Sequence, residues 1–216
     1  MKQTIATFLL SIAALASGFA EEKAAPAAPA AAEKAPKVTV KTNLGSFVVE
    51  LNQEKAPITV ENFLSYVGKK HYDGTVFHRV IGNFMIQGGG FTVEEGKLIE
   101  KTTGKGIQNE AKNGLTNDRG TIAMARTGDP NSATAQFFVN VVDNAMLNAP
   151  NPDGHGYAVF GKVVEGMDVV DKIKAVPTDM GQLTMIHKAS GEKVTQPVPD
   201  VPRDKVIIES ITRIAK

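Results

Sequence analysis

The chain has 216 residues, of which 42% are hydrophobic and 22% charged, with 24 Lys plus Arg against 23 Asp plus Glu. This composition is typical of a soluble globular protein and excludes collagen-like, coiled-coil and wholly disordered chains. The absence of cysteine excludes disulfides, thiol nucleophiles and thiolate metal sites, and a net charge of +1 without a basic stripe argues against nucleic acid as the main ligand.

The first twenty residues have the pattern of a secretory signal peptide. Lys2 precedes a short apolar stretch over 5–19, and the small residues Gly18 and Ala20 fit the positions before a cleavage site. The stretch is shorter than the roughly 20 apolar residues that span a membrane. We therefore expect cleavage after Ala20 and no stable membrane insertion afterwards; an uncleaved anchor is the alternative.

Residues 21–36 are expected to form a disordered linker between the signal peptide (1–20) and a folded domain over 37–216. The segment contains eight alanines, three prolines and five charged residues, and no bulky apolar side chain that a core could bury.

Within 37–216, short patterns of alternating residues predict strands. Alternation over 38–51 around an Asn-Leu-Gly-Ser turn predicts a β-hairpin. Apolar residues at i, i+3, i+4 and i+7 then predict an amphipathic helix from about Ala56 to Gly68, capped by Thr59 or by a residue just before Pro57. Further strands are predicted over 75–81, 84–87, 121–125, 137–142, 158–164 and 206–214.

A second helix is predicted over 167–175, ending before Pro177, and the polar, proline-containing segment 178–203 is assigned as a long connection. Many short strands separated by glycine turns, with only two helices, favour an antiparallel barrel or sandwich over an alternating β/α fold. In a barrel, the two helices could close the open ends.

Two motifs suggest ligands but lack essential residues. The segment 156–162 matches most of a phosphate-binding loop, but Val163 stands where a magnesium-binding Ser or Thr is needed. The segment 151–154 suggests a calcium loop, but Ala149 and Phe160 occupy its first and last ligand positions. The four histidines lack metal-ligand spacing, so neither metal nor cofactor is expected, although a site assembled only by the fold stays open.

Two segments, 77–90 and 132–140, carry the most distinctive residues. If Gly82-Asn83 bends the chain, Arg79 and an amide can flank an apolar surface made by Phe84, Met85 and Phe138. Taken singly, each aromatic residue or methionine is more typical of core packing, and Arg79 of a solvated strand.

Taken together, these segments resemble the cyclophilin-type peptidyl-prolyl cis–trans isomerases. The segments 56–63, 77–90, 121–125, 136–138 and 157–163 match the family in order, and the resemblance covers nearly all of 37–216. It implies a mainly β fold, a closed eight-stranded antiparallel β-barrel capped by two α-helices. Combined with the signal peptide, it implies a periplasmic member such as those of Gram-negative bacteria.

The resemblance also implies a site without cofactor or metal. Arg79 is the expected catalytic residue, donating to the prolyl nitrogen as the amide bond twists. Phe84, Met85, Phe138 and Leu147 are expected to grip the proline ring, Gln87 and Gln136 to hold backbone or orient Arg79, and Tyr157 to line the pocket. The remaining expected substrate-binding residues are Ala125, Arg126 and Met146.

Three departures from the family pattern carry further expectations. Gly82-Asn83 replaces the usual Pro-Gly, and Asn tolerates the left-handed conformation. Met146 stands where many eukaryotic members have a tryptophan associated with cyclosporin, so weak cyclosporin binding is expected. Arg126 replaces a frequent asparagine, which would favour acidic residues before proline.

The expected partners are unfolded or partly folded exported polypeptides with X-Pro bonds, bound by a monomer that isomerises them. The alternative is a non-catalytic proline-peptide-binding chaperone or adaptor, which would keep the pocket but not need Arg79. A scaffold with a degenerate pocket is a further alternative, against which the intact motif argues.

Overall fold

The computed structural model describes residues 35–186 and 191–215. The predicted signal peptide and nearly all of the predicted linker lie outside these residues. Among the helices that are described, none has the length and apolarity needed to cross a membrane.

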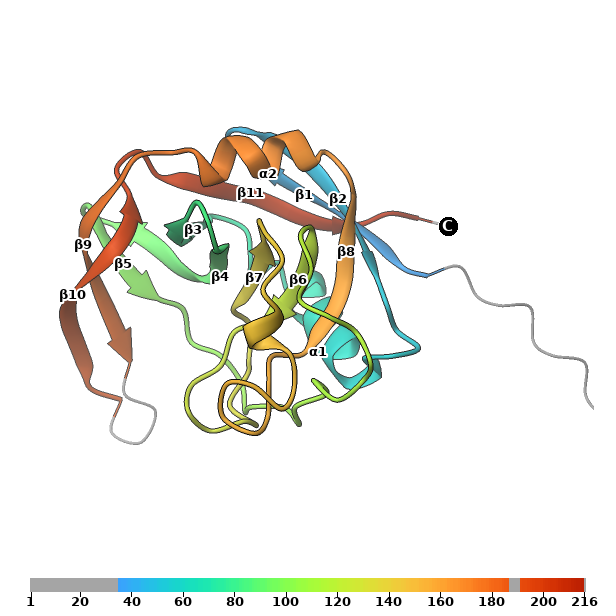
Figure 1. Cartoon of the computed structure of the whole chain (residues 1–216). Helices are drawn as coiled ribbons and strands as arrows, with labels where there is room; N and C mark the ends of the chain where they lie inside the picture. Colours follow the sequence, from blue (N-terminus) through green and yellow to red (C-terminus); the bar gives the residue numbers. More distant parts are fainter. Residues whose placement is uncertain (1–34, 187–190, 216) are drawn as a thin grey trace, which may run out of the picture. The chain divides into compact units, whose positions relative to one another are not determined.

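Eight strands close into an antiparallel barrel (Figure 1). Around the barrel their order is β3-β11-β1-β2-β8-β6-β7-β4, and β4 pairs back with β3. Closure leaves no free edge within this ring of strands. The bounds are β1 Lys37–Thr42, β2 Gly45–Leu51, β3 Thr75–Ile81, β4 Met85–Glu94, β6 Thr121–Met124, β7 Phe137–Asn140, β8 Val159–Glu165 and β11 Val206–Arg213. The fold class expected from the sequence is confirmed.

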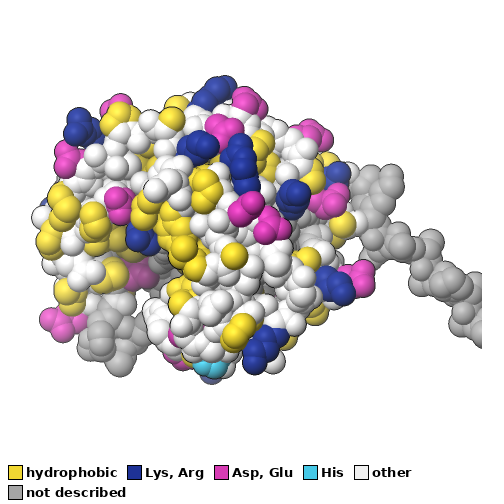
Figure 2. All heavy atoms as spheres, in the orientation of Figure 1, with side chains coloured by type: hydrophobic (Ala, Val, Ile, Leu, Met, Phe, Trp, Pro, Cys, Tyr) yellow, Lys and Arg dark blue, Asp and Glu magenta, His cyan; other side chains and the backbone are white. Residues whose placement is uncertain are grey.

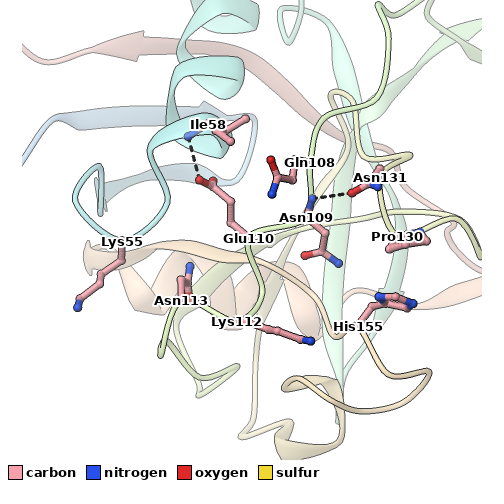
Figure 3. Close-up of a pocket in the computed structure, with 10 residues that line it drawn as sticks. All are labelled: Lys55, Ile58, Gln108, Asn109, Glu110, Lys112, Asn113, Pro130, Asn131 and His155. Atoms are coloured by element: carbon pink, nitrogen blue, oxygen red, sulfur yellow. Dashed lines mark hydrogen bonds between the residues drawn. The ribbon is translucent and has the colours of Figure 1, made fainter.

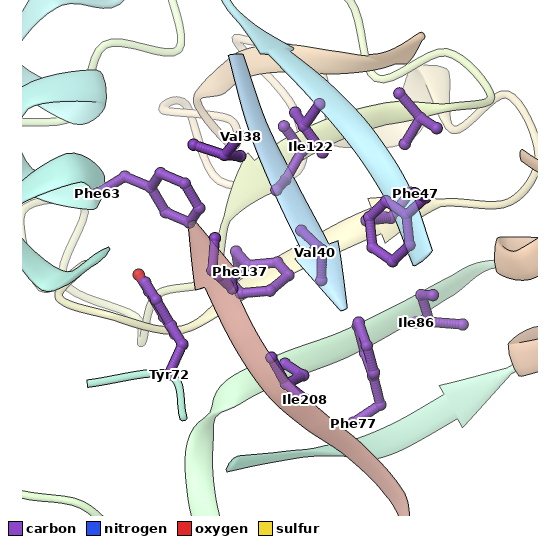
Figure 4. Packing of buried hydrophobic residues seen from close by; sticks show 14 of the residues in the cluster. Val38, Val40, Phe47, Phe63, Tyr72, Phe77, Ile86, Ile122, Phe137 and Ile208 are labelled. Atoms are coloured by element: carbon purple, nitrogen blue, oxygen red, sulfur yellow. The ribbon is translucent and has the colours of Figure 1, made fainter. Parts of the chain in front are cut away.

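The barrel interior is filled by side chains that alternate along the strands. On β1, Val38 and Val40 are fully buried while their neighbours are more exposed. Figure 4 shows Phe47, Phe63 and Phe137 gathered in this interior. The rings of Phe63 and Phe137 meet edge to face, with centroids 5.9 Å apart. Because the interior is a packed core, a binding site has to lie on the outside of the barrel.

Helices α1 (Pro57–Gly68) and α2 (Met167–Lys174) each bury an apolar face against this core. The predicted cap of α1 is wrong, because its N-cap residue, Ala56, makes no side-chain hydrogen bond. The carboxylate of Glu110 caps the helix instead, accepting hydrogen bonds from the backbone N–H groups of Ile58 (3.1 Å) and Thr59 (2.8 Å). An acidic group at this end also complements the helix dipole.

The assignment of 178–203 as a long connection is wrong. The segment contains strands β9 (Thr178–Ile186) and β10 (Lys193–Pro202), which pair with each other and are named here the β9–β10 arm. β9 also pairs in parallel with β5 (Lys97–Glu100), which was not predicted, and β5 pairs with β4. The arm therefore extends the barrel sheet beyond β4, as the left side of Figure 1 shows.

The arm escaped prediction because it is an edge structure. Most side chains of β10 are exposed, and proline is tolerated in an edge strand because a ladder hydrogen bond is not needed there. A small second core attaches it to the barrel sheet. That core consists of Val76, Phe91, Leu98, Leu183 and Val201.

Candidate active site

Nine of the eleven predicted site residues line one cavity of about 130 Å³. They come from β3, β4 and the turn between them, from β7, from the chain after β6, from the short 3-10 helix η1 (Ala145–Leu147) and from the chain before β8. Figure 2 shows a band of hydrophobic side chains over β4 and β7 on this face. The lining residues are Arg79, Phe84, Met85, Gln87, Ala125, Arg126, Phe138, Leu147 and Tyr157.

The cavity has an apolar floor on the outer surface of the barrel. Strand alternation explains the placement, since Phe137 points into the barrel core while its neighbour Phe138 packs outside with Met85 and Leu147. The Phe138 and Tyr157 rings meet edge to face, with centroids 5.8 Å apart. These four side chains form a firm apolar surface that suits a small apolar ring.

The polar side of the cavity is built on the β3–β4 pair. Arg79 and Gln87 are register partners, and the Gln87 Nε2 donates a hydrogen bond of 2.9 Å to the Gln136 Oε1. Gln136 does not line the cavity itself but joins it through this bond. The Arg79 side chain keeps 45% of its surface exposed, and its Nε lies 3.9 Å from the Asp200 Oδ2. A cation thus faces the cavity beside a fixed amide pair.

The glycines that follow the cavity residues on β4 make room for this arrangement. A Cβ on Gly90 would lie 2.5 Å from the Gln136 Cγ, and one on Gly89 would lie 2.9 Å from the rings of Phe137 and Tyr72. The Gly-Gly-Gly run therefore allows close packing of the strand over its neighbours.

The bend at Gly82-Asn83 forms differently from the prediction. Neither residue has a positive φ, and the Phe84 N–H donates to the Ile81 carbonyl at 2.9 Å to close the turn. No left-handed residue is needed, so the replacement of Pro-Gly leaves the turn unstrained.

Arg126 is committed to contacts within the protein. Its guanidinium makes a two-pronged pair with Asp153 at 2.8 Å, donates from Nε to the Gly156 carbonyl and stacks 4.4 Å from the Tyr157 ring centroid. The Arg126 side chain is only 3% exposed. Hydrogen bonding from Arg126 lowers the pKa of Asp153 to about 2. Because its charge already has a partner, the structure argues against the expected preference for acidic residues before proline.

The sequence over residues 37–210 matches the family described as cyclophilin type peptidyl-prolyl cis-trans isomerase/CLD. The chain belongs to this family.

Relatives and solved structures agree with the match. A peptidyl-prolyl cis-trans isomerase of Streptomyces antibioticus is 55% identical over 175 residues, which cover 80% of this chain and 95% of the relative. Peptidyl-prolyl cis-trans isomerase B of Escherichia coli is 52% identical over 177 residues, covering 81% and 98%. A cyclophilin-type isomerase structure from Cryptosporidium parvum has a TM-score of 0.63 at 26% identity, covering 84% of this chain and 99% of that one. The chain is thus an enzyme with peptidyl-prolyl cis–trans isomerase activity.

A network of asparagine amides, which the sequence reasoning missed, joins two walls of the cyclophilin cavity. The buried Asn144 donates from Nδ2 to the Phe84 carbonyl (2.8 Å) and to the Asn140 Oδ1 (2.7 Å). Asn140 in turn donates to Asn117 and to the Thr121 hydroxyl. No sequence motif marks this set, because its members meet only when η1 docks against β7.

Met146, like Gln136, is a predicted site residue that does not line the cavity, and among the described contacts no hydrogen bond joins its side chain to a lining residue. It neighbours Leu147 on η1, but its side chain is 65% exposed while Leu147 is buried. One turn of η1 therefore sends successive residues in different directions.

A larger hollow, of about 620 Å³, lies elsewhere on the isomerase (Figure 3). Most of its lining residues are polar or charged. Several of them hold the fold together, since Glu110 caps α1 and the Asn109 N–H donates to the Asn131 side chain. Among the described residues, Ile58 and Pro130 are its only apolar lining residues, whereas Phe84, Met85, Phe138 and Leu147 line the cavity beside Arg79. The smaller cavity is the candidate active site, because it combines an apolar surface for a proline ring with a hydrogen-bond donor.

Proposed function

We propose that this isomerase acts on X-Pro bonds of exported polypeptides and that Arg79 supplies the transition-state stabilisation. One observation carries the proposal: the permanently charged Arg79 lines the same cavity as the apolar floor of Met85 and Phe138. A proline ring on that floor would bring its amide within reach of the guanidinium.

The reaction breaks no covalent bond, but its activation barrier is high. The peptide C–N bond has partial double-bond character and a rotation barrier of about 18–20 kcal/mol. In the twisted state resonance is lost and the prolyl nitrogen regains a lone pair that can accept a hydrogen bond. Binding this state more tightly than either planar isomer is sufficient for catalysis, and no covalent intermediate is needed.

Arg79 suits this role better than a lysine would. Its planar guanidinium offers several donors in a fixed fork, which can serve the prolyl nitrogen and a neighbouring carbonyl together. Because arginine stays protonated at all physiological pH values, we expect isomerase activity to vary little around neutral pH.

Gln87, together with Gln136, and Ala125 would hold the substrate backbone. The Gln87–Gln136 pair presents fixed amide groups beside Arg79. The Ala125 N–H already donates to the Gln136 carbonyl at 3.0 Å, so Ala125 would bind substrate through its own carbonyl.

The leader pattern over 1–20 supports export, and with the resemblance to periplasmic members it supports a periplasmic location. The partners would then be unfolded or partly folded exported chains, bound by a monomer. Cyclosporin would bind weakly, since Met146 offers no indole ring at the cavity rim. N-terminal sequencing of the protein from a periplasmic fraction should begin at Glu21; an intact leader in that fraction would contradict the proposal.

The mechanism is tested by NMR exchange spectroscopy on an X-Pro peptide with the wild type, Arg79→Ala, Arg79→Lys and the control Arg213→Ala, which changes an exposed arginine at the end of β11. We expect fast exchange with the wild type and the control, and a large loss in both Arg79 variants despite normal folding. A folded wild type that binds the peptide without accelerating exchange would favour the chaperone or adaptor alternative. Full activity of Arg79→Ala would refute the proposed mechanism.

A further inference from the structure

The β9–β10 arm brings an acidic residue to the proposed catalytic arginine. The Oδ2 of Asp200, near the end of β10, lies 3.9 Å from the Nε of Arg79 on β3. The Asp200 side chain is 34% exposed, so the pair sits at the protein surface beside the cavity. The distance exceeds that of a hydrogen bond, and the contact is therefore an ion pair that attracts the guanidinium without fixing each atom.

Asp200 is presented by a backbone irregularity. Its φ of 64° lies in the left-handed region, which Asp tolerates better than most residues, and the β9–β10 register shifts between Val198 and Val201. Bulges of this kind often re-aim a side chain next to an active site. Here the irregularity accompanies the turn of one carboxylate toward β3.

The residue that follows Asp200 in the chain is held in place by packing. Val201 is 2% exposed and packs with Leu183 and Leu98 in the second core. The two strands of the arm approach closely here, since a Cβ on Gly181 would lie 2.7 Å from the Val201 Cγ2. β10 also packs against β3, the strand that carries Arg79. The carboxylate and the arginine are thus held on adjoining, packed strands.

We propose that Asp200 is a positioning residue for Arg79, an inference that rests on the proposed catalytic role of that arginine. The carboxylate attracts the Nε edge of the guanidinium, which leaves the two terminal nitrogens to serve the substrate. Limiting the rotamers of a long side chain in this way favours the arrangement needed in the transition state. The effect acts on the rate of isomerisation rather than on peptide affinity, because the peptide need not contact Asp200.

The size of the effect follows from the exposure of the pair. Exposed ion pairs of this kind change equilibria by small factors, so we expect Asp200→Asn to lower kcat by about two- to fivefold. High salt should likewise lower the kcat of the wild type, because it screens the attraction between Asp200 and Arg79: the screening length falls to about 3 Å in 1 M salt. The Asn variant keeps the shape and the left-handed tolerance of the aspartate, so the fold of the arm is preserved.

The test compares Asp200→Asn with Asp179→Asn, which breaks another exposed ion pair of the same arm, with Arg203 at 3.4 Å. NMR exchange spectroscopy on an X-Pro peptide gives the catalysed rate, and titration gives the peptide Kd. For Asp200→Asn we expect a lower kcat with an unchanged peptide Kd, and for Asp179→Asn we expect wild-type values of both. In 1 M NaCl the catalysed rate should fall for the wild type but not for Asp200→Asn. The Arg79 Nε–H resonance, assigned by its absence in Arg79→Lys, should shift in Asp200→Asn only.

An unchanged kcat in Asp200→Asn, or an equal loss in Asp179→Asn, would overturn the inference while leaving the catalytic role of Arg79 intact. Full activity of Arg79→Ala would instead overturn the proposed mechanism itself. The two failures are therefore distinguishable in one set of variants.

Discussion

Gly90 on β4 offers a way to disturb the Gln87–Gln136 contact without touching any lining side chain. A Cβ at this position would lie 2.5 Å from the Gln136 Cγ, 2.6 Å from its Cδ and 2.7 Å from its Nε2. Gly90 has no positive φ, so alanine adds no backbone strain, and the clash falls on one flexible side chain. In Gly90→Ala, Gln136 must therefore move and release the 2.9 Å hydrogen bond from Gln87.

The magnitude follows from these contacts. A side chain forced off its rotamer costs about 0.5–1.5 kcal/mol, and a neutral hydrogen bond contributes about 0.5–1.5 kcal/mol. We expect the free energy of unfolding to fall by about 1–2 kcal/mol, within the usual range for a single substitution. If the hydrogen bond matters only in the transition state, kcat/KM should fall by about two- to tenfold.

The assay pairs urea unfolding with NMR exchange kinetics, and Gly68→Ala is the matched control. Gly68 is the last residue of α1, and no atom lies within 4 Å of a Cβ built on it. That substitution should leave kcat/KM unchanged and raise stability by a few tenths of a kcal/mol to about 1 kcal/mol. Wild-type kcat/KM in a correctly folded Gly90→Ala protein would refute the role assigned to the glutamine pair.

Three further predictions address the cavity wall, the pH dependence of stability and drug binding. Asn144→Ala removes the donor to the Phe84 carbonyl and leaves the buried Asn140 acceptor unsatisfied. The free energy of unfolding measured in urea should therefore fall by about 1–3 kcal/mol. A fall of less than about 0.5 kcal/mol would count against the network. Burial lowers the pKa of His78 to about 3 from 6.5, so its contribution to stability is complete above pH 6.5 and is lost as the pH falls toward 3. Thermal unfolding across pH should therefore be flatter in His78→Phe than in the wild type, and parallel curves would contradict this. Met146→Trp should raise cyclosporin affinity in an inhibition titration while isomerase activity stays unchanged. An unaltered affinity would contradict the view that the missing indole ring causes weak cyclosporin binding.

The strands of the barrel were predictable because their signal is local. Alternation along β1 puts Val38 and Val40 in the core. The same alternation along β7 puts Phe137 in the barrel core and Phe138 on the outer surface. The closed form of the barrel came from the family resemblance, since alternation alone does not distinguish a barrel from a sandwich.

The β9–β10 arm was not predictable from its own residues. Its exposed strands bury little, and its prolines are typical of loops as well as of edge strands. Only pairing with β5 and packing of Val201 and Leu183 into the second core decide that the segment is a sheet. The cap of α1 was predicted wrongly because it too depends on a distant segment: Glu110 lies 51 residues beyond Thr59 in the sequence.

The sequence by itself determined which residues alternate into the barrel core and, through the family resemblance, all nine of the residues that line the cavity. The tertiary structure alone decided that Met146 points away, that Arg126 is paired with Asp153 and that Asp200 approaches Arg79. The physical reason is that the period of a strand is a local property of the chain. Contacts between distant segments depend instead on the path of the backbone, and neither composition nor spacing records that path.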